Sequence, residues 1–244
     1  MLIIILGAIV SYFLGAIPFG LVIGFMKGVD IRKSGSGNIG ATNLGRVLGG
    51  IKWFLYAFLL DFAKGVAAPL LFMFVVKEIV TPNTETLVFL IENPEYCMVI
   101  YSFFAIIGHI FPIYLKFKGG KGVATGAGII AVLAPIAFGI CMIAFVFVVL
   151  LTRIVSISSI IASIVLVISQ IALNFNSAFD AKLPVTLFCI ITMLLILFRH
   201  RTNIINIFNG TEVRINLGKM KADEPTQKPL EHLDNHNQKE EKSD

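Results

Sequence analysis

Two short stretches combine glycine with hydroxyl, amide and cationic side chains, although the rest of the chain is strongly apolar. The first is SGSGNIGATNLGR, residues 34–46, and the second is KFKGGKGVAT, residues 116–125. Glycine has no Cβ and so lets backbone amides approach an anion closely, while lysine or arginine supplies the opposite charge. Both stretches adjoin segments long enough to enter a bilayer. Together they predict a phosphate-handling site at a membrane surface, with an anionic substrate.

The first stretch is richer in hydrogen-bonding side chains than a plain connector needs to be. Ser36 stands between two glycines and can bring its hydroxyl close to a ligand, and Arg46 can hold a phosphate through two parallel hydrogen bonds. Asn38, Thr42 and Asn43 add further short polar groups. The alternative interpretation is a solvated turn with helix-capping residues.

The second stretch opens directly into an apolar segment. Gly119, Gly120, Lys121 and Gly122, with Lys118 before them, would place free amides and a lysine at a helix N-terminus, where the helix dipole favours an anion. The spacing is not that of a nucleotide P-loop. A flexible basic turn is the alternative interpretation.

A third polar stretch, RHRTNIINIFNGTE at residues 199–212, follows the last apolar segment. His200 in this stretch can accept a proton or, as a neutral ring, donate to a phosphate, unless its flanking arginines merely anchor the chain at the interface. His109 is expected to be a buried, hydrogen-bonded histidine. Asp61 and Lys64 lie three residues apart on one helical face, so we predict that they pair and brace the floor of the site.

The composition predicts an integral membrane protein. Mean hydropathy is +0.87 over 244 residues, with 57% hydrophobic and only 14% charged residues. The net charge of +5 is scattered over short loops without a basic face or aromatic platform, which argues against a nucleic-acid partner. Cys97, Cys141 and Cys189 stand far apart in apolar runs, so neither a metal site nor a disulfide is predicted.

Six apolar blocks approach or exceed the roughly 20 residues that a spanning helix needs. They cover residues 2–26, 53–76, 96–115, 122–152, 154–179 and 183–198. We expect the first block to be one retained helix rather than a cleaved signal. Loops 27–52 and 116–121 are basic, whereas residues 77–95 carry four glutamates and one lysine, so the positive-inside rule places the N-terminus outside.

The fourth block is too long for one ordinary span and contains Ala134-Pro135, where a helix should break. Two helices, 122–133 and 135–152, bring the total to seven helical segments, some of them short. The prediction is therefore an all-α, polytopic membrane helix bundle over residues 1–215, with all three polar stretches and the C-terminus on the cytoplasmic side. Residues 216–244 are predicted to form a disordered cytoplasmic tail.

Taken together, SGSGNIGATNLGR, GHIFPIYLKFKGGKGVAT and RHRTNI followed by NGTE resemble, in order and spacing, a known family. This is the acyl-phosphate-dependent glycerol-3-phosphate acyltransferase family of bacterial membranes, and the resemblance covers about residues 1–215. It implies a transmembrane enzyme of phospholipid synthesis that transfers an acyl group from acyl phosphate to the sn-1 hydroxyl of glycerol 3-phosphate. The products would be lysophosphatidic acid and phosphate. The implied location is the bacterial cell membrane, with the site facing the cytoplasm, membrane lipid as a further partner and no cofactor.

The resemblance also implies roles, position by position. Ser36 and Arg46 match essential residues of the first motif, and His200 and Asn203 match the catalytic pair of the third. Glu212 matches a glutamate linked to structural integrity. The glycine-rich second motif, with Gly119, Gly120, Lys121 and Gly122, corresponds to the part that binds glycerol 3-phosphate.

Two points stay open at this level. The proton of the attacking hydroxyl can pass to His200 or to a phosphate oxygen of the donor. A transporter for a phosphorylated metabolite is the main rival, but it calls for polar groups along a path to the far side of the membrane. An H-x-x-x-x-D acyltransferase motif is excluded at His109 and at His200, because the fifth residues after them are Tyr114 and Ile205. A D-G-x-x-A-R metal signature is likewise absent from the sequence.

Overall fold

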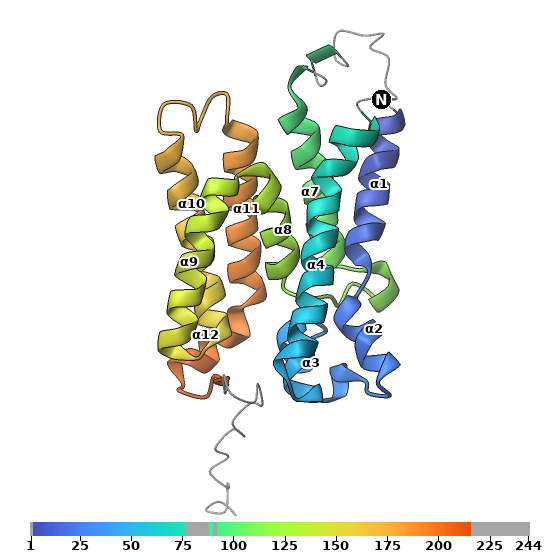
Figure 1. Ribbon diagram of the computed structural model, residues 1–244, viewed down its shortest axis with the longest axis vertical. Helices are drawn as coiled ribbons and strands as arrows, with labels where there is room; N and C mark the ends of the chain where they lie inside the picture. Colours follow the sequence, from blue (N-terminus) through green and yellow to red (C-terminus); the bar gives the residue numbers. More distant parts are fainter. Residues whose placement is uncertain (1, 77–87, 90–91, 216–244) are drawn as a thin grey trace, which may run out of the picture.

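The computed structural model describes residues 2–76, 88–89 and 92–215, and its regular elements there are helices. The predicted tail over residues 216–244 and most of the predicted outer loop at 77–95 lie outside the described residues. The elements and their bounds, labelled as in Figure 1, are α1 (Leu2–Ala16), α2 (Phe19–Met26), η1 (Ile31–Lys33), α3 (Ala41–Leu48), α4 (Ile51–Leu71), η2 (Phe72–Val76), α7 (Pro94–Ile110), η3 (Ile113–Leu115), α8 (Val123–Leu133), α9 (Pro135–Thr152), α10 (Val155–Leu173), α11 (Leu183–Arg199) and α12 (Arg201–Phe208).

The long helices form two groups that α8 joins (Figure 1). On one side α1 packs against α7 and both contact α4, and on the other side α9 and α11 each pack against α10. Helix α8 packs mainly on α4 and also contacts α7, α9 and α11. The short helices α3 and α12 both lie at one end of the bundle, α3 beside α4 and α12 beside α11, opposite the end where the N-terminus lies.

The helix break predicted at Ala134-Pro135 is confirmed. Helix α8 ends at Leu133, and α9 begins at Pro135, whose missing N–H costs nothing at the first position of a helix. At 1.5 Å per residue, α8 is about 17 Å long, which is too short to cross a bilayer core of about 30 Å.

The prediction of one continuous helix over the first apolar block is wrong. The block divides at Pro18 into α1 and α2, whose axes differ by 42°. Proline cannot donate the hydrogen bond that would continue α1, and its ring clashes with the preceding turn. The bend turns α2 into the end of the bundle that holds α3.

Glycine allows α4 and α8 to pack with their backbones in contact. A Cβ added to Gly65 would lie 2.1 Å from the carbonyl oxygen of Thr125, and one added to Gly128 would lie 2.0 Å from that of Phe62. Small residues at helix contacts are typical of membrane proteins, where close packing replaces the hydrophobic effect as the source of helix association. Helix α8 is therefore fixed to α4 despite its short length.

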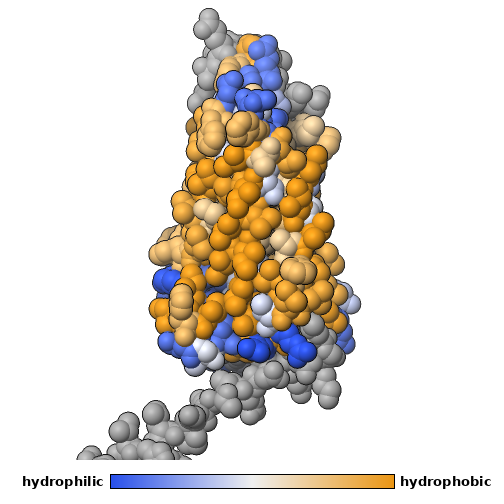
Figure 2. Space-filling model, turned by 90° about the vertical axis from the view of Figure 1, so that its left-hand side faces the viewer, coloured by the Kyte–Doolittle hydropathy of each residue, from blue (hydrophilic) through white to orange (hydrophobic). Residues whose placement is uncertain are grey.

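The face of the bundle in Figure 2 is apolar between two polar ends. Helix α9 contributes much of this surface, because only 6% of its most apolar window is buried and side chains such as Ile143 and Phe147 are exposed. Among the described residues, four helices are long and apolar enough to cross a membrane, or six if each of the two bent pairs counts as one span. An apolar band of this kind indicates an integral membrane protein.

Candidate active site

The three polar stretches of the sequence meet in one pocket at the end of the bundle that holds α3 and α12. Ser36, Arg46, Lys121 and His200 all line it, although they lie up to 164 positions apart in the sequence. The pocket is partly open to the surface and has a volume of about 140 Å³. Other predicted site residues in the lining are Asn38, Thr42, Asn43, Asp61, Gly122, Asn203 and Glu212.

Four predicted residues lie outside the pocket lining. Lys118 is exposed to solvent, Gly119 and Gly120 are buried behind Lys121, and Lys64 is buried behind Asp61.

The first stretch wraps around the buried side chain of Asn43 on α3. Its amide nitrogen donates to the carbonyl oxygens of Ile31 at 2.8 Å, Asn38 at 2.8 Å and Ser34 at 3.2 Å. Its Oδ1 accepts from the backbone N–H of Ser36 at 2.8 Å. A buried amide that makes all of these bonds fixes the loop, so Ser36 is held at the pocket by Asn43.

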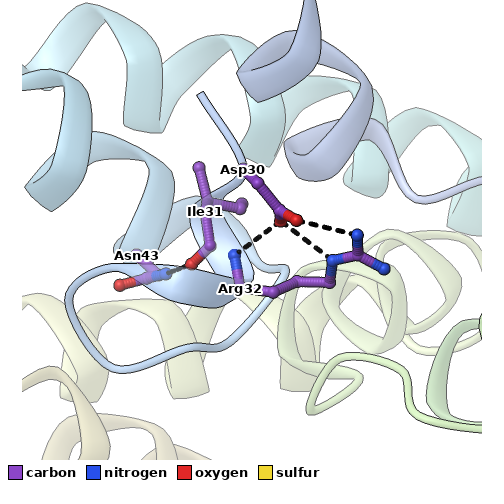
Figure 3. A network of polar contacts seen from close by, with 4 residues as sticks. All are labelled: Asp30, Ile31, Arg32 and Asn43. Carbon is purple, nitrogen blue, oxygen red and sulfur yellow. Dashed lines mark hydrogen bonds and ion pairs between the residues drawn. The ribbon is translucent and has the colours of Figure 1, made fainter. Parts of the chain in front are cut away.

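Figure 3 shows this region with a second, separate contact. Asn43 reaches the carbonyl of Ile31, whereas Arg32 turns away to Asp30 and binds its carboxylate through Nε at 2.9 Å and NH2 at 2.8 Å. The hydrogen bonds from Arg32 lower the pKa of Asp30 to about 2. Arg32 is therefore already paired, and Arg46 is the arginine of this region that lines the pocket.

Arg46 has unused hydrogen-bonding capacity. Its Nε is buried, and no group among the described residues accepts a hydrogen bond from it. Burial lowers the pKa of Arg46 while the charge of Glu212 acts in the other direction, but an arginine stays charged at neutral pH. A buried donor without a partner is costly, so an anion entering the pocket gains a ready bond.

The second stretch differs from its prediction at Gly119 and Gly120. Their amides are not free for an anion, because they donate to the carbonyls of Ile110 and His109, each at 3.1 Å. These carbonyls belong to the last residues of α7, and the last carbonyls of a helix have no donor within the helix itself. The two glycines therefore close the end of α7, and Lys121 is the side chain of this segment that reaches the pocket.

Lys121 begins a chain of hydrogen bonds across the pocket wall. Its Nζ donates to Oδ1 of Asn203 at 2.7 Å, and Nδ2 of Asn203 donates to Oε1 of Glu212 at 2.6 Å. The same carboxylate oxygen accepts from the hydroxyl of Ser156 at 2.6 Å. Glu212 thus fixes which way the Asn203 amide points, and Asn203 in turn orients the ammonium group.

Burial lowers the pKa of Lys121 to about 8. The charges of Arg46 and Arg199 lower it further, and Glu212 acts in the opposite direction. Lys121 is therefore mainly a cation at neutral pH and loses its charge in mildly alkaline solution. It shares the pocket with Arg46, so two cations face one cavity.

His200 lies at the junction of α11 and α12 and is 2% exposed. Its Nδ1 is 2.8 Å from the carbonyl oxygen of Ile196, which can only accept, so Nδ1 carries the proton of the neutral ring. Nε2 is then an acceptor, and the predicted role of a neutral His200 as donor to a phosphate is corrected. The ring can accept a proton, and it can donate to a phosphate only after doing so.

A buried polar cluster forms the floor of the pocket. The predicted pairing of Asp61 with Lys64 is confirmed, with Nζ 2.8 Å from Oδ1. Lys64 also donates to the carbonyl of Ile17 at the bend between α1 and α2, 2.6 Å away. His109 is buried and hydrogen-bonded, as expected, with Nδ1 3.1 Å from the hydroxyl of Thr125. The cluster joins α4, α7 and α8 beneath the site.

Two residues near the site were missed by sequence reasoning. Arg199 donates to the carbonyl oxygens of Gly119 at 2.8 Å and Gly120 at 3.1 Å, whereas the sequence indicates only an interfacial anchor. Ser156 lines the pocket and holds Glu212, but a single serine in an apolar helix carries no signal of its own. The one available signal is chemical: an arginine carries two donors at a fixed spacing, which suits the two carbonyl oxygens of a glycine pair.

The fold and the pocket define a class: an integral membrane protein with a cationic, hydroxyl-bearing pocket at one end of a helix bundle. A family model described as glycerol-3-phosphate acyltransferase matches residues 5–210. The glycerol-3-phosphate acyltransferase of Staphylococcus carnosus is 42% identical over 217 residues, covering 87% of this chain and 98% of the relative. That of Bacillus cytotoxicus is 36% identical over 215 residues, covering 86% and 94%.

A solved structure is similar as well. The crystal structure of PlsY, described as an integral membrane glycerol 3-phosphate acyltransferase in its glycerol 3-phosphate form, aligns with a TM-score of 0.72 and 32% identity. The alignment covers 87% of this chain and 96% of PlsY. The chain therefore belongs to the glycerol-3-phosphate acyltransferase family.

Proposed function

We propose that this protein transfers an acyl group from acyl phosphate to the sn-1 hydroxyl of glycerol 3-phosphate, releasing lysophosphatidic acid and inorganic phosphate. The observation that carries the proposal is the meeting of Arg46 and Lys121 in one pocket with Ser36 and His200. The reaction brings two phosphate-bearing substrates together, and a site with two cations compensates their mutual repulsion.

The apolar side of the pocket supports an acyl donor. A second cavity of about 50 Å³ shares Val123, Phe145 and Ser159 with the pocket and continues between α8, α9, α10 and α11. Its lining is almost entirely apolar. We propose that the acyl chain lies there, which places the carbonyl carbon at the boundary between the apolar cavity and the cationic pocket.

The proposed reaction needs little from the protein beyond placement. The substrate hydroxyl oxygen attacks the carbonyl carbon, the bond from that carbon to the phosphate oxygen breaks, and phosphate leaves with the bonding electrons. Arg46 and Lys121 hold the two phosphates, and Ser36 with Asn203 orients the reacting groups. The hydroxyl proton passes either to Nε2 of His200, which is free to accept it, or to an oxygen of the departing phosphate.

The activity test uses the full chain purified in detergent. With glycerol 3-phosphate and acyl phosphate, we expect equal amounts of inorganic phosphate and lysolipid, and much less product when acyl-CoA replaces acyl phosphate. Product from acyl-CoA alone would overturn the proposed donor. Exchange of glycerol 3-phosphate across sealed vesicles without any lysolipid would favour the transporter instead.

A second experiment separates the two proton acceptors. His200→Ala is compared with the wild type in the pH dependence of turnover. If His200 accepts the proton, the acidic limb of the profile disappears in the variant together with most of the activity. An unchanged acidic limb would leave the departing phosphate as the acceptor.

We also propose seven helical segments, α1 with α2, α4, α7, α8, α9, α10 and α11, in the bacterial cell membrane. The pocket end would face the cytoplasm, and the N-terminus would lie outside. The basic residues of the loops gather at the pocket end, as the positive-inside rule expects of a cytoplasmic face; they include Lys27, Arg32, Lys33, Lys52, Lys116, Lys118 and Arg153. Labelling of single introduced cysteines from either side of intact cells tests this orientation.

A further inference from the structure

The residues that precede Lys121 are hydrogen-bonded along both edges of the backbone. On one edge the amides of Gly119 and Gly120 donate to the end of α7. On the other edge their carbonyls accept from Arg199, through NH2 at 2.8 Å and Nε at 3.1 Å. The glycine pair is thus held between the end of α7 and the guanidinium group of Arg199, which is not among the residues that line the cavity.

Arg199 suits this contact for a geometric reason. Its planar guanidinium presents two donors at a fixed spacing, which match two successive carbonyl oxygens, whereas a lysine offers a single ammonium group. It is half-buried at the last residue of α11, 79 positions from Gly120. The contact therefore joins two segments that are remote in the sequence.

Each end of this contact is one residue away from a pocket residue. Gly120 is followed by Lys121, and Arg199 is followed by His200. The tip of Lys121 makes a second connection to the same region through Asn203, at 2.7 Å. The segment carrying the lysine is thus joined to the segment carrying the histidine at both its backbone and its side-chain end.

We propose that Arg199 is a positioning residue that sets the placement of Lys121 relative to His200. This inference rests on the proposed function, because it concerns the geometry of the same reaction. Arg199 does not line the cavity, so its effect on the placement of Lys121 passes through the glycine pair. A displacement of about 1 Å at reacting groups lowers a rate by about 100-fold.

Arg201 supplies a matched control. It lies two residues further along and is also an arginine at the same end of the bundle, but its side chain is exposed. Its polar contacts within the described part of the chain are with its own turn, where Nη1 lies 3.2 Å from the carbonyl oxygen of Phe198 and the guanidinium 4.7 Å from the centre of the Phe198 ring. Loss of an interfacial anchor would affect both arginines alike, whereas loss of positioning would affect Arg199 alone.

The experiment compares Arg199→Lys and Arg199→Gln with Arg201→Lys and Arg201→Gln in the full chain. We measure kcat, KM for glycerol 3-phosphate, the midpoint of thermal unfolding in detergent and the pH profile of kcat/KM. Arg199→Lys keeps the charge and loses the two-donor geometry, so we expect kcat to fall by about 10- to 100-fold while KM rises by no more than about threefold. Both Arg201 variants should stay within about twofold of the wild type.

The pH profile gives a readout that a merely structural role would not move. Besides Arg199, the charged groups acting on Lys121 are Arg46 and Glu212. In Arg199→Gln the alkaline limb should shift to higher pH, because one of the two positive charges that oppose protonation of Lys121 is gone. In Arg199→Lys and both Arg201 variants the limb should stay in place.

Three results would overturn the inference while leaving the proposed function intact. These are an Arg199→Lys variant with wild-type kcat, equal losses at Arg199 and Arg201, or failure of both Arg199 variants to fold while the Arg201 variants fold. The last result would make Arg199 a folding residue rather than a positioning one. A wild-type protein without acyl transfer would instead refute the proposed function itself.

Discussion

The two glycine-rich loops look alike in sequence but use glycine for different physical reasons. In the first loop Gly35 and Gly37 adopt φ angles of +60° and +69°, which let the chain turn around Asn43. In the second loop Gly119 and Gly120 have ordinary φ angles, and glycine is needed because there is no room for a side chain. A Cβ on Gly120 would lie 2.1 Å from Nε2 of His109. One loop needs glycine for conformation and the other needs it for contact.

The difference shows that neither loop acts as a bare cradle of amides. In both cases backbone groups are bonded inside the protein, to Asn43 in the first loop and to α7 and Arg199 in the second. Each loop presents or adjoins one cation at the pocket, Arg46 on α3 in the first case and Lys121 in the second. The loops are supports that present cations, and each support can be tested separately from the cation that it presents.

The largest effect is expected from the cation of the first loop. Arg46→Ala should lower kcat/KM by about 100- to 1000-fold, since it removes a buried donor aimed at a substrate anion. Arg46→Lys should recover only part of this loss, because a single ammonium cannot bond two oxygens in parallel. The measurement is steady-state release of phosphate, and full activity in Arg46→Lys would show that charge alone is enough.

The support of the first loop comes next. Asn43→Ala removes four hydrogen bonds and should reduce the free energy of unfolding by about 3 kcal/mol, at about 0.5–1.5 kcal/mol per bond. Asn174→Ala is the control, because that amide makes a single bond, to the carbonyl of Gln170. Thermal unfolding in detergent provides the comparison, and equal midpoints for the two variants would contradict the role of Asn43.

In the second loop, a larger residue in place of Gly120 should lower stability, because it would clash with its neighbours. Gly120→Ala forces the His109 ring or the backbone to move, at a cost of about 1–3 kcal/mol, and displaces Lys121. Gly139→Ala in α9, where an added Cβ meets nothing within 4 Å, should leave stability unchanged or raise it.

A swap of residue type sharpens this contrast between the loops. Asparagine tolerates positive φ, so Gly37→Asn should keep most of its activity. Gly120→Asn should lose most of its activity, since there is no room for a side chain beside His109. If both asparagine variants behaved alike, the distinction between conformation and contact would be lost.

The smallest effect concerns the cation of the second loop. Burial sets the pKa of Lys121 near 8, so the charged form prevails below that pH and disappears above it. From pH 7 to pH 9, kcat/KM for glycerol 3-phosphate should fall about tenfold, because Lys121 loses its charge over this range. The substrate phosphate, with a second pKa of about 6, is already charged and contributes little to the change. Lys121→Arg should keep a flat profile over this range, and an alkaline limb that persisted in this variant would assign the titration to another group.

The sequence was sufficient for the parts of this molecule that depend on local chemistry. The apolar blocks, the break at Pro135 and the pairing of Asp61 with Lys64 follow from hydropathy, proline and helical spacing. The meeting of Ser36, Arg46, Lys121 and His200 in one pocket could be expected once the polar stretches were assigned to one side of the membrane.

Other features depend on contacts that no pattern in the sequence records. The bend at Pro18 was overlooked because the apolar run continues through it without a polar residue. The carbonyls that occupy the Gly119 and Gly120 amides, and the arginine on the opposite edge, come from helices remote in the sequence. The tautomer of His200 depends likewise on the carbonyl of Ile196, which only the turn at the end of α11 brings near.

The shortness of α8 affects how the enzyme responds to its surroundings. A helix of about 17 Å is too short to reach the lipid headgroup regions on both sides of a membrane, so lipid contacts alone cannot fix its position. The reversal is self-contained, since Ala134 donates to Ile130 and accepts from Phe138, and Pro135 has no N–H to satisfy. The position of Lys121 at the start of α8 is therefore set by contacts within the protein, chiefly with α4, and catalysis should tolerate membranes of different thickness.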